Sequence, residues 1–145
     1  MKTDAIEAIG NTPLVDVSML SPDPKIHIYG KLESVNPTGS VKDRAARSLI
    51  EVAESEGLIN PGDTILEPTS GNTGLGLAMI GRIKGYNVKV VMPASVPPER
   101  IQLLQAFGAE VILSHKDKGT NESIIVAKQL SEENPSYFMP YQYGN

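Results

Sequence analysis

Hydrophobic positions follow two different periods along the chain. Short runs rich in Val, Ile and Leu, bounded by Gly, Pro, Asn or Asp, predict strands. Longer segments, in which apolar residues recur every three to four positions, predict helices. The predicted strands are residues 14–18, 26–33, 64–67, 87–93, 110–114 and 137–140, and the predicted helices are residues 40–56, 72–84, 98–107 and 120–133. From residue 40 onward helix and strand alternate, which indicates an α/β fold with a parallel sheet covered on both faces.

The first 39 residues do not fit this alternation. Their two short strands have no obvious sheet to join, and the chain stops after "PYQYGN" without a helix to follow the last strand. We therefore expect residues 1–39 to be N-terminal strands of a second, larger domain that is mostly absent. We expect residues 40–145 to form a small parallel α/β domain, and the whole sequence to be part of a larger protein.

Composition narrows the classes of function. The 145 residues include 13 basic and 17 acidic side chains, a net charge of −4, with both signs mixed along the chain. Without a basic stripe, nucleic acid is not an expected partner. The absence of cysteine excludes disulfides and thiolate metal sites, and His27 and His115 lack the close spacing of zinc ligands, so no metal is expected. No apolar run reaches membrane-spanning length, and we expect a cytoplasmic protein with no membrane partner.

Lys42 is unusual within the helix predicted over residues 40–56. At ~100° per residue it falls in the middle of an apolar stripe. The stripe consists of Ala45, Ala46, Leu49 and Ala53. Ser40 is a suitable N-cap and Asp43 its capping-box partner, which places Lys42 in the first turn. The helix dipole and burial both favour a neutral amine there, a nucleophile suited to Schiff-base chemistry. Alternatively, the stem of the lysine covers the core while its head reaches water.

The stretch "EPTSGNTGLG" comes directly after a predicted strand and opens the next helix. Ligands of open α/β sheets bind at this end of the strands. Ser70, Gly71, Asn72 and Thr73 offer hydroxyls, an amide and backbone N–H groups to an anion. The spacing G-x-x-G-x-G is not the dinucleotide fingerprint, and no Gly-Lys-Ser/Thr follows as in a P-loop. Anion binding and a glycine-rich turn required for tight packing are the two interpretations.

Taken together, these stretches resemble a known family. "NPTGSVKDR" followed by "EPTSGNTG", "KGY", "VMP", "ER" and "FGAE" is similar to the cysteine synthase (O-acetylserine sulfhydrylase) family of fold type II pyridoxal-phosphate enzymes. "IGNTPLV" near the start and "YQYGN" at the end extend the resemblance over essentially all 145 residues. The ending and "LEPTSGNTG" look most like the B-type branch, some members of which use O-phosphoserine or a protein-borne sulfur donor.

The resemblance implies a role for each candidate residue. Lys42 matches the lysine that binds pyridoxal 5′-phosphate covalently. The loop of residues 70–73 matches the segment that grips the substrate α-carboxylate, and Asn72 also matches the group that hydrogen-bonds the 3′ oxygen of the cofactor. Gln142 matches a further contact with the carboxylate.

The implied activity is a β-replacement that gives L-cysteine. The substrate would be O-acetylserine or O-phosphoserine, the freed lysine would remove the Cα proton, and the full-length protein would be a homodimer. The sulfur donor and the leaving group stay open. One alternative is cystathionine β-synthase or another β-eliminating relative. A second is a non-catalytic fragment that binds a small anion or a partner.

The sequence also departs from the family pattern. "PASVPPER" carries prolines where the family more often has polar residues, and "GTNES" replaces the usual small-residue stretch. Both lie in the segment that resembles the family's mobile part. The glycine-rich phosphate cup and the residue that faces the pyridine nitrogen are not in this sequence. We therefore expect residues 1–145 alone to have no appreciable cysteine synthase activity.

Overall fold

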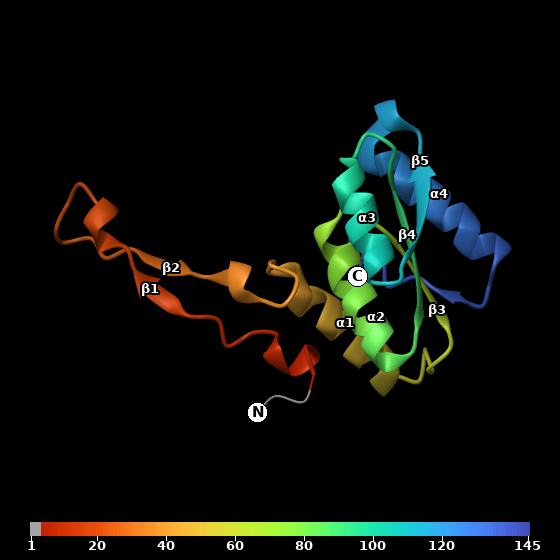
Figure 1. Cartoon of the computed structure of the whole chain (residues 1–145), viewed down its shortest axis with the longest axis horizontal. Coiled ribbons are helices and arrows are strands. Elements are labelled where there is room, and N and C mark those ends of the chain that lie inside the picture. Colours follow the sequence, from red (N-terminus) through yellow and green to blue (C-terminus); the bar gives the residue numbers. More distant parts are fainter. Residues whose placement is uncertain (1–3) are drawn as a thin grey trace.

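Two short strands near the N-terminus form an arm that projects from the rest of the chain (Figure 1). In the computed structural model, which describes residues 4–145, β1 (Leu14–Asp16) and β2 (Tyr29–Lys31) pair antiparallel. Both strands are shorter than predicted, and they pair with each other rather than with the parallel sheet. Apolar side chains along the arm stay exposed, among them Leu14, Met19, Leu20, Ile26 and Tyr29.

Single 3₁₀ turns lie at Ile6–Ala8, Ser18–Leu20, Glu33–Val35 and Lys116–Lys118.

A polar network around Glu33 fixes the base of the arm to the first helix. The Glu33 carboxylate accepts hydrogen bonds from Thr12 Oγ1 at 2.6 Å and from Arg44 Nε at 2.9 Å. The Arg44 guanidinium and the Thr12 hydroxyl lower the pKa of Glu33 to about 2. Buried Asn36 donates to the same carboxylate and accepts from Gly10 N at 2.9 Å. The base of the arm is therefore held by directed polar contacts.

The body is built on a four-stranded parallel sheet. β3 (Thr64–Pro68), β4 (Asn87–Pro93), β5 (Glu110–Ser114) and β6 (Tyr137–Phe138) lie in the order β5-β4-β3-β6. Neighbouring residues of a strand point to opposite faces, and both faces of the central strands are buried. The predicted α/β fold with a parallel sheet is confirmed.

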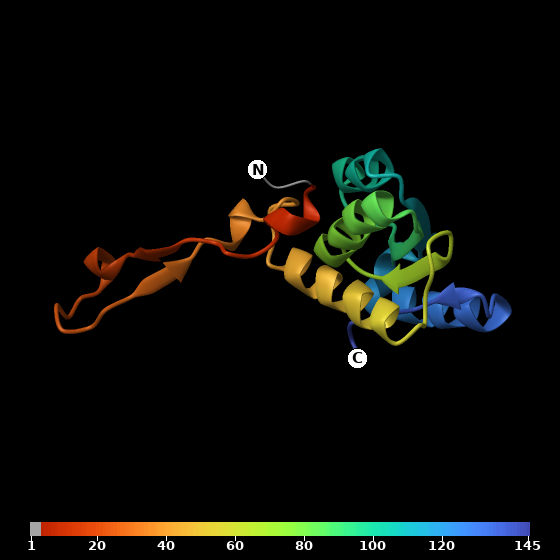
Figure 2. The same ribbon diagram turned by 90° about the horizontal axis from the view of Figure 1, so that it is seen from below.

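Helices cover both faces of this sheet (Figures 1 and 2). The helices α1 (Lys42–Ser55), α2 (Asn72–Lys84) and α3 (Pro98–Ala106) contribute to the larger apolar core, together with Ile65 and Val90. On the other face, α4 (Gly119–Glu133) packs through Ala127 on Leu66 and Val91. Within residues 4–145, no helix has the length and apolar character needed to cross a lipid bilayer.

The start of α1 differs from the prediction. The helix begins at Lys42, where Ser40 Oγ accepts from Lys42 N at 3.1 Å. The Asp43 carboxylate does not reach back to Ser40; it accepts from Thr38 N at 2.7 Å and from the Thr38 hydroxyl. The predicted capping box is therefore wrong, because the turn before the helix already occupies the buried Asp43 carboxylate.

Helices α1 and α2 lie side by side (Figure 2), and they approach each other closely at Gly76. A Cβ atom on Gly76 would lie 2.9 Å from the Cβ of Ala46 and 3.4 Å from the Cα of Asp43. Asp43 and Ala46 are fully buried at this contact. The absence of a side chain at residue 76 therefore lets the first turn of α1 lie directly on α2.

We predict that Gly76→Val destabilises the protein by about 1–3 kcal/mol, because the added atoms overpack this contact. The matched control is Ala106→Val at an exposed position near the end of α3, which should change stability by less than about 0.5 kcal/mol. Urea unfolding of both variants measures the difference. If Gly76→Val were as stable as the control, the helix contact would not be tight in solution.

Candidate functional site

A cavity of about 230 Å³ lies beyond the carboxyl end of β3. The loop after β3, the first residues of α1 and α3, and the C-terminal segment all contribute to it. Its lining consists of Lys42, Thr69, Ser70, Asn72, Thr73, Arg100, Gln142 and Tyr143. Two of these side chains are basic and none is acidic, so the lining suits an anionic ligand. The structure thus brings together Lys42, the predicted loop and Gln142 from three separate parts of the sequence.

Lys42 reaches this cavity from the edge of its helix. Its side chain is exposed, so the predicted inward position is wrong. The buried stripe of α1 consists of Asp43, Ala46, Ile50 and Ala53. At 100° per residue, Lys42 lies about 60° from the middle of that stripe. Lys42 also lines a second hollow of about 230 Å³, to which Leu49 and Gln142 contribute. The amine is accessible to a ligand.

The loop between β3 and α2 is shaped by Gly71 and Arg100. Gly71 has φ 152° and ψ −70°, a conformation that favours glycine. A Cβ atom at residue 71 would lie 2.0 Å from Arg100 Nη1, so a side chain there would clash with the guanidinium. Arg100 Nη1 donates to Asn72 Oδ1 at 3.1 Å. Because the amide oxygen of Asn72 is engaged, its Nδ2 is available as a donor. Gly71 N is already satisfied by Thr69 Oγ1 at 3.1 Å.

Gln142 joins the site through the first turn of α2. Thr73 Oγ1 donates to Gln142 Oε1 at 2.7 Å, although the two residues are 69 positions apart. The Nε2 atom of Gln142 donates to the carbonyl oxygen of Pro68 at 3.5 Å, and the amide nitrogen carries a second N–H group that a ligand could accept from. In both Gln142 and Asn72, the side-chain amide oxygen thus accepts a hydrogen bond from a neighbouring side chain.

Glu67 was not predicted as a site residue. It lies in β3 directly before Pro68 and is fully buried. Its carboxylate accepts from Tyr141 N at 2.8 Å and from Gln142 N at 3.0 Å. Burial raises the pKa of Glu67 to about 7, and the two N–H groups oppose that rise. The sequence signal that could have revealed it is an acidic residue at the end of an otherwise apolar strand.

Arg100 was also missed as a lining residue, whereas Tyr143 was one of three neighbouring residues, with Tyr141 and Gln142, for which lining a site and plain exposure were equally plausible. "PPER" is readily explained as the start of a helix, and Tyr143 lies near the chain end. Burial raises the pKa of Tyr143, and the charge of Glu67 adds to this effect. Neither position carries a sequence pattern that separates a lining residue from an ordinary surface residue.

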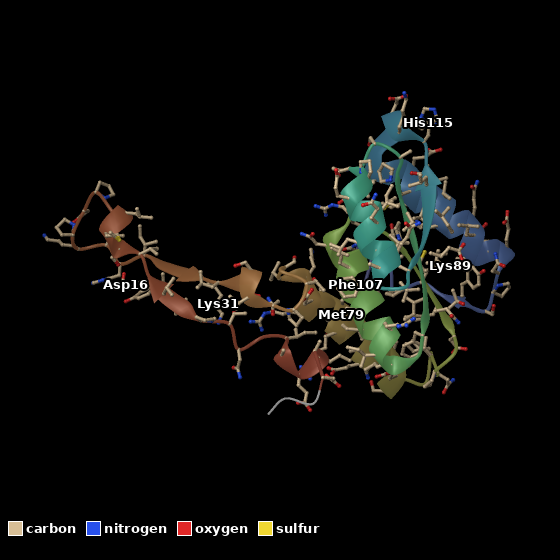
Figure 3. The ribbon with its side chains drawn as sticks, viewed as in Figure 1. Asp16, Lys31, Met79, Lys89, Phe107 and His115 are labelled. Carbon is tan, nitrogen blue, oxygen red and sulfur yellow. The ribbon has the colours of Figure 1, made fainter. Side chains whose placement is uncertain are left out.

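A larger hollow of about 330 Å³ lies at the opposite edge of the sheet. Its lining includes the first residues of three strands, Thr64, Asn87 and Glu110. Lys89, labelled in Figure 3, also lines it. Its amine forms an ion pair with Glu110. None of the predicted site residues contributes to this hollow, so size does not identify the functional site here.

The two histidines lie apart from the cavity. His27 is on the arm, and His115 follows β5 at one end of the body (Figure 3). Among residues 4–145, no group of three or more histidine, aspartate or glutamate side chains is placed to hold a metal ion.

Comparison with known proteins identifies the family. Residues 6–145 match the sequence model of a protein family that is described as "Pyridoxal-phosphate dependent enzyme". The chain belongs to this family. A probable cysteine synthase of Bacillus subtilis (strain 168) is 49% identical over 139 residues, which cover 96% of this chain and 45% of that protein. The chain therefore spans about half the length of the curated relatives it matches.

Solved structures agree with this assignment. O-Acetyl serine sulfhydrylase isoform 3 from Entamoeba histolytica has a TM-score of 0.91 and 40% identity, covering 100% of this chain and 45% of that one. A hydrogen sulfide-producing enzyme from Fusobacterium nucleatum has a TM-score of 0.88 and 45% identity, covering 97% of this chain and 46% of that one. The fold is that of fold type II pyridoxal-phosphate enzymes.

The lining residues fit the cofactor of this family. Lys42 offers an accessible primary amine, the group that forms a Schiff base with an aldehyde. Asn72 Nδ2 is a free donor for a ring oxygen, because Arg100 already occupies the amide oxygen. No carboxylate lines the cavity, so nothing in the lining repels a phosphate.

The raised pKa of Glu67 gives a testable dependence of stability on pH. The unfolded carboxyl releases its proton near its ordinary pKa of 4.5, whereas the native carboxyl releases it near 7. Between these values the native state binds more protons, so the free energy of unfolding falls as pH rises, by at most about 1.4 kcal/mol per pH unit from this group. Glu67→Gln has no such titration. The stability of the wild type relative to this variant should decrease from pH 4.5 to 7 and level off above. Urea unfolding at several pH values measures it, and parallel profiles would contradict the prediction.

Proposed function

We propose that the complete protein containing this chain is a pyridoxal-phosphate-dependent cysteine synthase. It would replace the acetyl or phosphate leaving group of O-acetylserine or O-phosphoserine with sulfur to give L-cysteine. One observation carries the proposal: an accessible lysine amine and a donor-rich loop at the carboxyl edge of a parallel sheet share one cavity without a carboxylate. The 49% identity to a probable cysteine synthase supports the same activity.

Lys42 and Asn72 are the residues proposed to hold the cofactor. Lys42 Nζ would bind it covalently, and Asn72 Nδ2 would donate to its 3′ oxygen. The contact between Arg100 Nη1 and Asn72 Oδ1 supports the second role, because it orients the amide so that its nitrogen is the free end.

The loop of residues 70–73 and Gln142 are proposed to bind the substrate α-carboxylate. The first N–H groups of α2 have no partners within the helix, and the positive end of the helix dipole favours an anion there. Gln142 Nε2 is a further donor beside them. The Thr73 hydroxyl already donates to Gln142 Oε1, so its contribution is to orient Gln142 while its backbone N–H faces the anion.

Lys42 is also the proposed general base. Pyridoxal phosphate, when bound, supplies an electron sink that stabilises negative charge at the substrate α-carbon. Lys42 Nζ, once the substrate amine has taken its place, would accept the α-proton as a general base. Its position on the first turn of α1 keeps the amine close to the substrate, since that turn is held by Asp43 and Gly76.

The arm is proposed to belong to the larger domain of the complete enzyme, with residues 40–145 as the small domain. Two observations support this division: apolar side chains are exposed along the arm, and the matched relatives are about twice as long as this chain. Homodimer formation follows from the family resemblance alone and stays a prediction.

A β-eliminating activity is the second candidate. It is favoured by the 45% identity to a hydrogen sulfide-producing enzyme from Fusobacterium nucleatum. The proposed site residues would hold the amino acid in the same way in both reactions. They therefore do not determine which nucleophile attacks it. Assays of the complete protein for sulfide-dependent cysteine formation and for sulfide release from cysteine would separate the two activities. Turnover only in the second assay would refute the cysteine synthase proposal.

We predict that Lys42→Ala in the complete protein abolishes covalent cofactor binding and leaves the fold intact, since the side chain is exposed. Borohydride reduction of the loaded enzyme, followed by peptide mapping, locates the pyridoxyl label. The control is Lys25→Ala on the exposed turn of the arm, which should label normally. A label on Lys31, which lies on the arm (Figure 3), or on Lys84 would show that the assignment of Lys42 is incorrect.

We predict that Asn72→Ala and Thr73→Ala weaken amino-acid binding more than cofactor binding. Asn72→Ala removes a hydrogen bond to the charged ligand, worth about 1.5–3 kcal/mol. Thr73→Ala removes the neutral hydrogen bond that orients Gln142, worth about 0.5–1.5 kcal/mol. Spectral titration of the loaded enzyme with L-cysteine gives the dissociation constant. Asn121→Ala, at an exposed position of α4, is the control. Unchanged dissociation constants in both loop variants would mean that the loop has only a structural role.

A further inference from the structure

We propose that Glu67 is a positioning residue for the amino-acid substrate, acting through Gln142. The proposal rests on the proposed function, in which Gln142 binds the substrate carboxylate. Glu67 itself does not line the cavity. It would fix the backbone of the segment that carries Gln142, so that the Gln142 amide faces the ligand in a single orientation.

The geometry around Glu67 matches that of an anion bound by a backbone nest. The N–H groups of Tyr141 and Gln142, two consecutive residues, converge on one carboxylate at 2.8 and 3.0 Å. Tyr141 has φ 53°, the left-handed conformation that a residue with a side chain rarely adopts. Turns of this kind point successive N–H groups toward an anion. In this protein the anion is a side chain from β3, some 75 residues earlier in the sequence.

Burying the Glu67 carboxylate is unfavourable unless other interactions offset its desolvation, and an apolar residue would pack better at this position. The two N–H groups provide these interactions, since an ionised carboxylate can accept from both. A glutamine has a single acceptor oxygen, and its amide nitrogen would face the second N–H group. The charge at residue 67 thus holds two adjacent residues of the C-terminal segment in a way that its neutral isostere cannot.

Gln142 is consequently fixed at both ends. Its backbone N–H is bound to Glu67, and its side-chain oxygen accepts from Thr73 at the start of α2. The ring of Tyr141 lies under Lys128 Nζ of α4, 4.9 Å from the ring centroid, and meets Tyr143 edge-on. These ring contacts restrain the side chain of Tyr141. Glu67 ties its backbone to the central strand that leads into the substrate loop.

The test uses the complete protein loaded with pyridoxal phosphate at about pH 8, where the Glu67 carboxyl, with its pKa of about 7, is mostly ionised. Glu67→Gln, Gln142→Ala and the double variant are titrated with L-cysteine, and cofactor content is measured in each. We expect Glu67→Gln to raise the dissociation constant roughly tenfold, as for one lost hydrogen bond to a charged group, with cofactor content unchanged. The double variant should bind within about twofold of Gln142→Ala, because residues that act through one another are not additive. Glu110→Gln, which neutralises an exposed carboxylate at the opposite edge of the sheet, is the matched control.

Amide hydrogen exchange provides a readout that does not depend on the ligand. Glu67→Gln should lose protection at Tyr141 and Gln142 while the amides of α2 stay protected. Glu67→Asp, which keeps the charge but withdraws it by one methylene, should behave in the same way. These exchange results test whether Glu67 holds the backbone of Tyr141 and Gln142, and they do so without a ligand. If the wild type bound the cofactor but no amino acid, the proposed function would be refuted, and the exchange test of Glu67 would still stand.

Three results would overturn the proposal. The first is a wild-type dissociation constant in Glu67→Gln. The second is an additive effect in the double variant, which would show that Glu67 does not act through Gln142. The third is loss of folding in both Glu67 variants, since Glu67 would then support the fold rather than the site.

Discussion

The close contact between α1 and α2 at Gly76 is the constraint on which the site depends. Lys42 and the loop of residues 70–73 each begin a helix, and these two helix ends meet only because α1 lies directly against α2. A Cβ atom at residue 76 would come within 2.9 Å of Ala46 and 3.4 Å of Asp43. Asp43 meanwhile holds the turn before α1 through Thr38. The contact of Gly76 with Ala46 and Asp43 thus determines the position of the Lys42 amine.

A second constraint comes from the parallel sheet. Parallel strands place their carboxyl ends at one edge, so the loop after β3 and the segment after β6 are neighbours although about 70 residues separate them. Glu67 and Thr73 turn this proximity into fixed geometry, one by binding the backbone of Gln142 and the other by binding its side chain. The polar contacts of the site therefore depend on strand order, which is set by apolar residues such as Ile65, Leu66, Val90 and Val91.

Much of the fold could be predicted from the sequence, and the reasons differ from element to element. Strands β4 and β5 and helix α2 match their predicted bounds, because apolar runs and glycine stops are local signals. Gly85, in the left-handed conformation, ends α2 as predicted. The arm was less predictable: its strands are short and exposed, so no buried face sets their length. Lys42 was expected to point inward, and the structure shows it exposed. Periodicity gives the direction of an apolar stripe only to within about one residue, and the small alanines make the predicted stripe broader than the buried one.

The site shows the same division between local and distant information. Lys42, the loop and Gln142 were found through motifs, whereas Glu67 and Arg100 act through contacts with residues 28 or more positions away. An acidic residue at the end of an apolar strand marks Glu67 as unusual, but no local pattern identifies the partners of either residue. These contacts give the cavity its chemical character. Arg100 engages the amide oxygen of Asn72, which leaves the Asn72 nitrogen as a donor. Thr73 engages the amide oxygen of Gln142, whose nitrogen also donates to the carbonyl oxygen of Pro68 at 3.5 Å. Together with the first N–H groups of α2 and the Lys42 amine, the cavity is lined mainly by donors and cations. Such a lining suits an anionic group, which would find partners on several sides, whereas a cationic group would meet Lys42 and Arg100 and no carboxylate.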